Sequence, residues 1–360
     1  MQLIVPHSYA VRKKLEVKVR RVPRAGALSP KGGAIDTFAR SDYNAHKMAE
    51  PSYLALYESG ELARRIEAAW AMLARCELCP HRCGVNRLAG DRGQRLGICR
   101  MGDQLKISSW NLHAWEEPPI SGTRGSGTIF FSGCTGRCRF CQNYPISQLG
   151  YGAVVTVEGL AAMMVELKRK GAHNINLVTP THFMPHVLAA LPHAIRAGLR
   201  LPLVYNTSGY ERAEVLRLLQ GVVDLWLPDA KYADDMVARR LSGFRGYVEH
   251  NRAALREIYR QVGKDLVLDG EGLAIRGLIV RHMVLPGGLA GSAEVLRWIA
   301  ENLSPGVHVS LMDQYFPAHR ALGDPALGRK ITWEEYEVAL DAWDAAGLER
   351  GWRQETLDDG

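Results

Sequence analysis

Three cysteines stand close together near the middle of the chain, in the stretch CTGRCRFC. They are Cys134, Cys138 and Cys141, spaced as C-x3-C-x2-C. A structural zinc ion usually takes four protein ligands, so three thiols leave one position unexplained. A 4Fe–4S cluster held by three thiolates would leave one iron open to a substrate or cofactor. The alternative is a zinc site completed by a distant histidine, such as His113 or His182.

The remaining cysteines form a second cluster upstream of this triplet. They lie in CELCPHRC and GIC, and they are Cys76, Cys79, Cys83 and Cys99. The chain has seven cysteines, an odd number that disulfides cannot consume completely. Their clustering favours metal binding by thiolates in a reducing compartment. Four thiolates can hold a structural zinc or an auxiliary 4Fe–4S cluster that relays an electron, and ordinary buried thiols are the remaining alternative.

Charged and polar side chains also stand at the ends of apolar runs. Asp229 and Lys231 in WLPDAKY are two residues apart on a predicted strand, so both should point to one face. A surface salt bridge is the alternative for this pair. Arg281 is a charge inside the apolar run IVRHMVLPGG, and a buried arginine requires a carboxylate from a ligand or from a structural Arg–Asp pair. Polar residues end two further runs: Thr179, Asn206, Thr207 and Ser208.

The elements that position these residues follow a strand–helix rhythm. Six apolar runs, TIFFSG, NINLVTP, LPLVYNTSG, VDLWLPDA, GLIVRHMVLPG and HVSLMDQYF, alternate with amphipathic stretches. This alternation predicts a parallel sheet covered by helices, and six units are fewer than the eight of a closed barrel. An open partial barrel and a doubly wound sheet both fit. Residues 48–75 are predicted to be helical, and Thr332 with Glu335 has capping-box spacing before the last helix.

Composition and charge place the chain among globular proteins. It has 360 residues with 47% hydrophobic content, and no apolar run approaches the ~20 residues of a membrane helix. The formal net charge of +7 lies within residues 1–47, which predicts a flexible basic arm. Contact with nucleic acid or an acidic partner is the alternative, although no aromatic residue interrupts VRKKLEVKVRRVPR. We predict a cytoplasmic protein and leave an organelle transit peptide open.

The triplet, with Phe140 just before its last cysteine, resembles the signature of radical S-adenosylmethionine (SAM) enzymes. The resemblance covers about residues 76–345 and extends to CELCPHRCGVNR, VTPTHFMP and EEPPISGTRGSGTIFFSGCTGRCRFCQNYPIS. These motifs are similar to those of a family of iron–sulfur proteins related to pyruvate formate-lyase activating enzymes. The implied fold is α/β, a partial (β/α)6 barrel with a small N-terminal cysteine-rich metal-binding lobe.

The resemblance implies that Cys134, Cys138 and Cys141 hold a catalytic 4Fe–4S cluster. Its unique iron would bind SAM, and one electron would generate methionine and a 5′-deoxyadenosyl radical that abstracts hydrogen from a substrate. The family's third strand carries an acid where this sequence has Asn206, and its Gly-Gly-acid motif is absent around Thr179. The cofactor-binding residues implied by the resemblance are Phe140, Thr179, Asn206, Thr207, Ser208, Asp229, Lys231 and Arg281.

Three segments and two rival functions follow. We predict a basic arm over residues 1–47, a helical and cysteine-rich lobe over 48–120, and the radical SAM barrel over 121–350. The leading hypothesis is an oxidoreductase of activating-enzyme type that receives its electron from a flavodoxin or ferredoxin and acts on a protein or peptide, and an RNA or a small metabolite is left open as the substrate. No membrane partner is expected, and nucleic acid is disfavoured but left open. The alternative is a zinc-binding, non-catalytic interaction protein.

Overall fold

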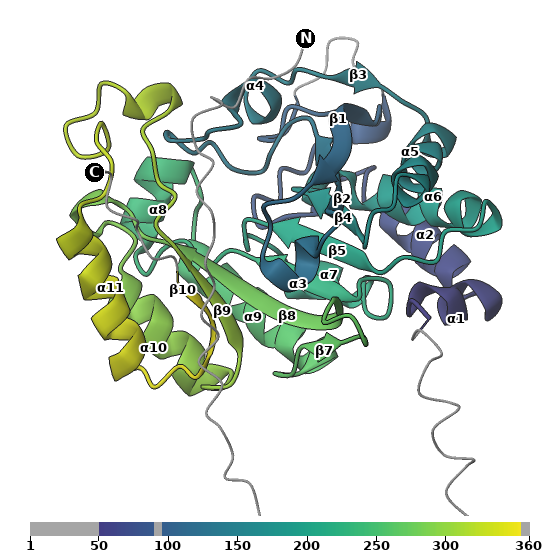
Figure 1. Cartoon of the computed structure of the whole chain (residues 1–360). Helices are drawn as coiled ribbons and strands as arrows, with labels where there is room; N and C mark the ends of the chain where they lie inside the picture. The colour runs from purple at the N-terminus through teal and green to yellow at the C-terminus, as the bar shows by residue number, and fades with distance from the viewer. Residues whose placement is uncertain (1–49, 90–95, 354–360) are drawn as a thin grey trace, which may run out of the picture. The chain divides into compact units, whose positions relative to one another are not determined.

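The computed structural model describes residues 50–89 and 96–353 (Figure 1). The predicted basic arm over residues 1–47 lies outside this part of the chain. Within the described part, no helix is both long and apolar enough to span a membrane.

Six parallel strands form the centre of a ten-stranded sheet. They correspond to the six predicted apolar runs and stand side by side in chain order. A doubly wound sheet reverses its strand order at a switch point, whereas these strands never reverse, as in a barrel. The structure therefore confirms a partial barrel of six units. The strands are β2 (Ser126–Phe131), β4 (Ile175–Val178), β5 (Leu203–Thr207), β6 (Leu225–Pro228), β8 (Ala274–Met283) and β9 (His308–Met312).

Four additional strands flank this centre and were not predicted. β1 (Lys106–His113) runs antiparallel to β2, and β3 (Ala153–Val154) pairs with β1. β10 (Arg350–Arg353) lies beside β9, and β7 (Val267–Leu268) pairs with β8. They escape a search for continuous apolar runs because they lie at the margins of the sheet and most of their residues are exposed or half-buried.

Helices cover the convex face of the sheet (Figure 1). Alternate strand residues, such as Ile129, Leu177 and Trp226, belong to the main apolar core with the helices. The two helices predicted within 48–75 are α1 and α2, and α2 packs on α6. The bounds are α1 (Tyr53–Glu58), α2 (Glu61–Ala71), α5 (Val157–Arg169), α6 (Met184–Arg196), α7 (Ala213–Arg217), α8 (Asp235–Ser242), α9 (Tyr247–Val262), α10 (Ser292–Asn302) and α11 (Trp333–Ala345).

The opposite, concave face of the sheet is the lumen of the partial barrel. A small apolar cluster on this face contains Val204, Leu227 and Ile279, together with Ile120 of the short helix α3 (Pro118–Ser121). Polar residues occupy further lumen positions, including Asn176 of β4 and Arg281 of β8. The lumen is therefore apolar in part and carries a charged zone.

The predicted capping box of α11 is present. The Glu335 amide donates to Thr332 Oγ1 at 3.3 Å, and the Thr332 amide donates to Glu335 Oε2 at 2.9 Å. We expect Thr332→Ala to lower the free energy of unfolding by about 1 kcal/mol because an orphan helix amide loses its acceptor. Urea denaturation measures this loss. Thr332→Ser keeps the hydroxyl and serves as the control, and an equal loss in that variant would contradict the capping explanation.

Candidate functional site

The cysteine triplet lies in the loop that follows β2, at the carboxyl edge of the parallel strands. Two glycines allow the loop to pack closely. Gly133 has φ of +80°, and a Cβ there would lie 2.8 Å from the Cys99 carbonyl oxygen. A Cβ on Gly136 would lie 2.8 Å from Phe244 Cζ. The loop therefore packs between the cysteine-rich lobe and the segment that follows α8.

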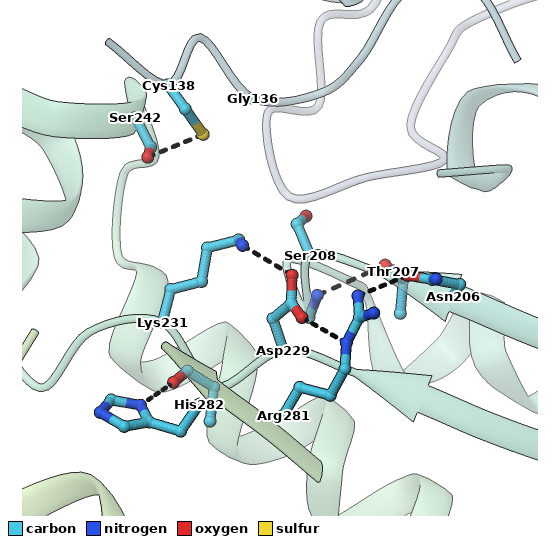
Figure 2. Close-up of polar contacts among 12 residues, drawn as sticks. Gly136, Cys138, Asn206, Thr207, Ser208, Asp229, Lys231, Ser242, Arg281 and His282 are labelled. Carbon is cyan, nitrogen blue, oxygen red and sulfur yellow. Dashed lines mark hydrogen bonds and ion pairs between the residues drawn. The ribbon is translucent and has the colours of Figure 1, made fainter. Parts of the chain in front are cut away.

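Each of the three sulfur atoms has a hydrogen-bonding neighbour. The Gly136 amide donates to Cys134 Sγ at 3.2 Å, and Ser242 Oγ donates to Cys138 Sγ at 3.0 Å (Figure 2). Cys141 Sγ lies 3.2 Å from Ser147 Oγ. Amide and hydroxyl donors of this kind stabilise thiolates that bind a metal cluster.

Burial makes the unliganded thiols reluctant to ionise. It raises the pKa of Cys134 to about 12 and that of Cys138 to about 11, and it raises the pKa of Cys141 as well. The Lys231 ammonium acts against this rise in all three. These thiols ionise when a positive partner is near, and a bound metal is such a partner because it displaces the thiol protons. Thiolates are soft ligands and are therefore suited to binding an iron–sulfur cluster. The donor set therefore fits a cluster.

The zinc alternative depended on a histidine that could complete the triplet. His182 is buried, its Nε2 lies 2.7 Å from the Ser132 carbonyl oxygen, and burial lowers its pKa to about 3. His113 pairs with Ser126 at the opposite end of β2 from the triplet. Within residues 50–89 and 96–353, no three His, Cys, Asp or Glu side chains converge as for a single metal ion.

An ionic network lies beneath the triplet loop (Figure 2). Lys231 Nζ is 2.6 Å from Asp229 Oδ2, and Arg281 Nε is 3.0 Å from Asp229 Oδ1. Burial tends to raise the pKa of Asp229, but Arg281 and Lys231 outweigh it and hold that pKa below its usual value. Asp229 and Lys231 thus meet as predicted, and at 11% and 19% side-chain exposure they are no surface pair. The prediction that both residues lie on one strand was wrong, because β6 ends at Pro228 and Lys231 lies beyond the strand.

Arg281 has other protein partners besides Asp229. Its Nη2 donates to Asn206 Oδ1 at 2.6 Å, and its Nη1 lies 3.5 Å from Glu116 Oε2. Structural pairing of this arginine, one of the two predicted alternatives, is therefore present. The neighbouring His282 faces away from the lumen, where its Nδ1 lies 2.6 Å from the Ala230 carbonyl oxygen.

The other predicted cofactor residues divide between the two faces of the sheet. Asn206 faces the lumen, and the buried Ser208 hydroxyl has no hydrogen-bond partner. The Thr207 hydroxyl instead donates to Glu211, away from the ionic network. Thr179 directly follows β4 and has φ of +56°, and its amide donates to the Asn206 carbonyl at 2.8 Å. Phe140 packs in a second apolar cluster, 5.6 Å from the Tyr315 ring.

Glu211 joins the ends of β4 and β5 beneath the site. Thr181 Oγ1 donates to Glu211 Oε1 at 2.5 Å, and Thr207 donates to the same oxygen. Burial raises the pKa of Glu211 to about 7 from 4.5, against these hydrogen bonds. The unfolded chain therefore releases this proton at lower pH than the folded protein.

This shift predicts a specific pH dependence of stability. Because the folded pKa is raised, the stability of the wild type relative to Glu211→Gln should fall as pH rises from about 4.5 to about 7 and then level off. The total loss is about 3 kcal/mol. Urea denaturation of both proteins at pH 4.5, 6 and 8 measures it. A stability difference that stays constant with pH would contradict a protonated Glu211.

The four-cysteine lobe lies directly against the triplet loop. His81 Nε2 is 2.8 Å from the Thr135 carbonyl oxygen, and Arg137 Nη2 donates to the Ile98 carbonyl at 2.5 Å. The four thiols influence one another electrostatically, and burial raises the pKa of Cys79 and Cys99. The lobe boundary predicted at residue 120 stays a prediction, as does the metal that this lobe would bind.

Sequence reasoning did not assign a role to three lumen residues. Glu116 and Glu117 follow β1, and Asn176 lies in β4, where its Nδ2 donates to Glu116 Oε1 at 3.2 Å. Two signals were available, namely the adjacent carboxylates in EEPPISG and the polar residue inside the apolar run NINLV. Neither reveals on its own that these residues meet Arg281.

Comparisons with known proteins give a family match, a relative and similar solved structures. Residues 128–270 match the family model described as the radical SAM superfamily. The Uncharacterized protein MJ0674 of Methanocaldococcus jannaschii is 31% identical over 316 residues, covering 84% of this chain and 82% of that protein. The solved structure of TYW1 with a lysine-pyruvate adduct bound has a TM-score of 0.41 and 12% identity, over 66% of this chain and 83% of that one. Methylornithine synthase (PylB) has a TM-score of 0.39 and 16% identity, over 59% of this chain and 60% of that one.

Fold and site together define an α/β partial barrel with a thiol triplet at the carboxyl edge of its parallel sheet. The chain belongs to the radical SAM superfamily. Membership implies a 4Fe–4S cluster and SAM as cofactors, and Cys134, Cys138 and Cys141 are the residues that fit the cluster.

Proposed function

We propose that this chain is a radical SAM oxidoreductase of activating-enzyme type. The observation that carries the proposal is the position of three half-buried thiols, each with a hydrogen-bonding neighbour, above the Lys231–Asp229–Arg281 network. A bound 4Fe–4S cluster would supply the electron that cleaves SAM and yields a 5′-deoxyadenosyl radical for hydrogen abstraction. The chain's own residues hold the reactants and exclude water.

We assign the binding of SAM to polar groups between the triplet and the lumen. Ser208 supplies an unpartnered hydroxyl, and Lys231 supplies an ammonium group close to the thiols. Arg281 can contribute Nη1, since its 3.5 Å contact with Glu116 is the longest of its three. Thr207 offers its backbone alone, because its hydroxyl is bonded to Glu211. Asn206, Asp229, Thr179 and Phe140 complete the proposed set.

Anaerobic reconstitution of the full chain tests this function. We expect about four irons bound to the triplet, and 5′-deoxyadenosine on reduction with dithionite in the presence of SAM. Protein that binds zinc alone and forms no 5′-deoxyadenosine would support the non-catalytic interaction protein instead. A protein that binds the cluster and SAM without cleaving SAM would contradict the enzyme function.

The four-cysteine lobe is proposed to hold a second metal centre. Cys76, Cys79, Cys83 and Cys99 lie within electrostatic reach of one another, and the Ile98 amide lies 3.5 Å from Cys83 Sγ. Metal analysis of the wild type and of Cys83→Ala tests the proposal. Loss of zinc in the variant assigns a structural zinc, whereas loss of about four irons assigns an auxiliary cluster. Unchanged metal content would contradict both.

The electron donor is proposed to be a flavodoxin or ferredoxin, and the substrate a protein or peptide. An open hollow of about 410 Å³ beside the lobe is lined by Leu96, Gly97, Ile98, Arg100 and Arg137. Arg137 lies close to both groups of cysteines, since Cys134 and Cys99 both act on its pKa, and Arg100 lies close to Arg137. A cationic surface with an apolar centre suits a docking redox protein of negative charge. Electron transfer from reduced flavodoxin should slow in Arg100→Glu and with added salt, while dithionite-driven cleavage stays unchanged.

A further inference from the structure

The floor of the barrel lumen is formed by the segment that follows β1. Because β1 ends opposite Ser126, the first residue of β2, this segment lies at the amino end of the parallel strands. Asn174 Nδ2 donates to the Ile120 carbonyl at 2.7 Å and anchors it there. From this floor Glu116 reaches up to Asn176 and to Arg281, which itself bonds Asp229 near the triplet. The Arg281 guanidinium therefore connects the floor to the proposed SAM site.

Two acceptors on this floor have no donor. The Glu117 side chain makes neither a hydrogen bond nor an ion pair within the described residues, although Glu117 is 6% exposed. Asn176 is fully buried, and its Oδ1 has no partner while its Nδ2 donates to Glu116. A buried acceptor without a donor destabilises the folded protein, and native structures keep few of them. Two buried acceptors without donors indicate a site that would bind a group carrying hydrogen-bond donors.

The charges on this floor indicate the kind of donor. Three carboxyl groups, on Glu116, Glu117 and Asp229, surround the Arg281 guanidinium, and Lys231 pairs with Asp229 on the triplet side. Within the described residues Arg281 forms ion pairs with Glu116 and Asp229, which leaves Glu117 without one. Burial raises the pKa of Glu116 to about 7, and a further cation beside it would favour its ionised form. The side chains of Glu116 and Arg281 keep 11% and 16% exposure, so each remains partly accessible to solvent. An added cation with N–H donors would satisfy both the charge and the orphan acceptors.

We propose that Glu116, Glu117 and Asn176 form a binding site for a protonated nitrogen of the substrate, an ammonium or guanidinium group. The site would hold this group at the bottom of the lumen and present the adjoining carbon atoms to the radical formed above. This role as a substrate site rests on the proposed function. The cation binding itself does not, because it depends on the floor residues alone.

Calorimetry on the reconstituted full chain tests the proposal, with SAM present at saturation. The probes are cadaverine and its neutral analogue 1,5-pentanediol. A second pair, acetyl-Gly-Lys-amide and acetyl-Gly-norleucine-amide, distinguishes a peptide side chain from a free amine. We expect the charged member of at least one pair to bind about tenfold or more tightly than its neutral partner. Equal binding within both pairs would overturn the proposal, as would competition between the charged probe and SAM.

Glu117→Gln is the decisive variant because it removes a carboxylate that has no protein partner. We expect it to weaken binding of the charged probe about tenfold, and to raise the thermal midpoint of the ligand-free protein because a buried unpaired charge is lost. A purely structural carboxylate would instead destabilise the protein when replaced. Glu301→Gln removes the same charge at an exposed position of α10 and should change neither measurement. A lowered midpoint with unchanged probe binding in Glu117→Gln would overturn the proposal.

Parallel measurements separate this inference from the proposed function. Iron content and 5′-deoxyadenosine formed without substrate report on the SAM chemistry, whereas calorimetry reports on the floor. Selective binding of the charged probe without cleavage of SAM would refute the enzyme function and leave the cation site standing. Cleavage of SAM with no preference for the charged probe would support the enzyme function and refute the cation site.

Discussion

Cys138→Ala should reduce cleavage of SAM to the background of iron-free protein. Three thiolates are the minimum that can hold a 4Fe–4S cluster while leaving one iron open. Ser242 Oγ donates to Cys138 Sγ and so helps to orient this ligand. We expect the same loss in Cys134→Ala and Cys141→Ala. Iron content, the cluster's visible absorption and 5′-deoxyadenosine are measured together after anaerobic reconstitution.

Cys83→Ala is the matched control for these variants. It removes a thiol of similar exposure from the neighbouring lobe, and we expect the iron of the triplet to remain. The contradicting outcome is a protein that still cleaves SAM at the wild-type rate after all three triplet cysteines are replaced by alanine. Such a result would remove the thiol triplet from the chemistry altogether.

The second large effect is expected from Asp229→Asn. This carboxylate pairs with two buried cations, Lys231 at 2.6 Å and Arg281 at 3.0 Å, so the amide leaves two positive charges facing each other. Loss of one partner from a buried ion pair costs about 3–5 kcal/mol. We expect a decrease of that size in the free energy of unfolding, measured with urea at pH 7, and a parallel loss of SAM cleavage.

Two comparisons make the Asp229 prediction specific. Asp265→Asn removes an exposed carboxylate that also pairs with a lysine and an arginine, and it should cost about 1 kcal/mol or less. The pKa of Asp229 is lowered, so its contribution is present above the unfolded value of 3.8 and is lost as pH falls through the lower folded pKa. The gap between wild type and Asp229→Asn should thus persist at pH 7 and narrow below about pH 3.8. A gap that grows on acidification would contradict the ion-pair explanation.

The six-unit strand rhythm was readable in the sequence because central parallel strands are buried on both faces. Such strands appear as continuous apolar runs, and each predicted run became a strand. β1, β3, β7 and β10 have no such signal, because most of their residues are exposed or half-buried. Apolar runs also do not reveal the order of the strands within a sheet, so the sequence left a doubly wound sheet open, and the unreversed strand order decided for the barrel.

The sequence by itself located the thiol triplet and its missing fourth ligand, because ligand type and close spacing are local properties of one loop, and the family resemblance favoured a cluster over zinc. It also located Asp229, Lys231 and Arg281 as buried charges that need partners. The tertiary structure alone decided which partners they have: Asp229 neutralises both cations, Thr207 points to Glu211, and Glu116 meets Arg281 from the other end of the lumen. The physical reason is that a buried charge takes its partner from whatever lies near it in space. Glu116 and Arg281 are far apart along the chain, so the spacing of residues in the sequence cannot predict their contact.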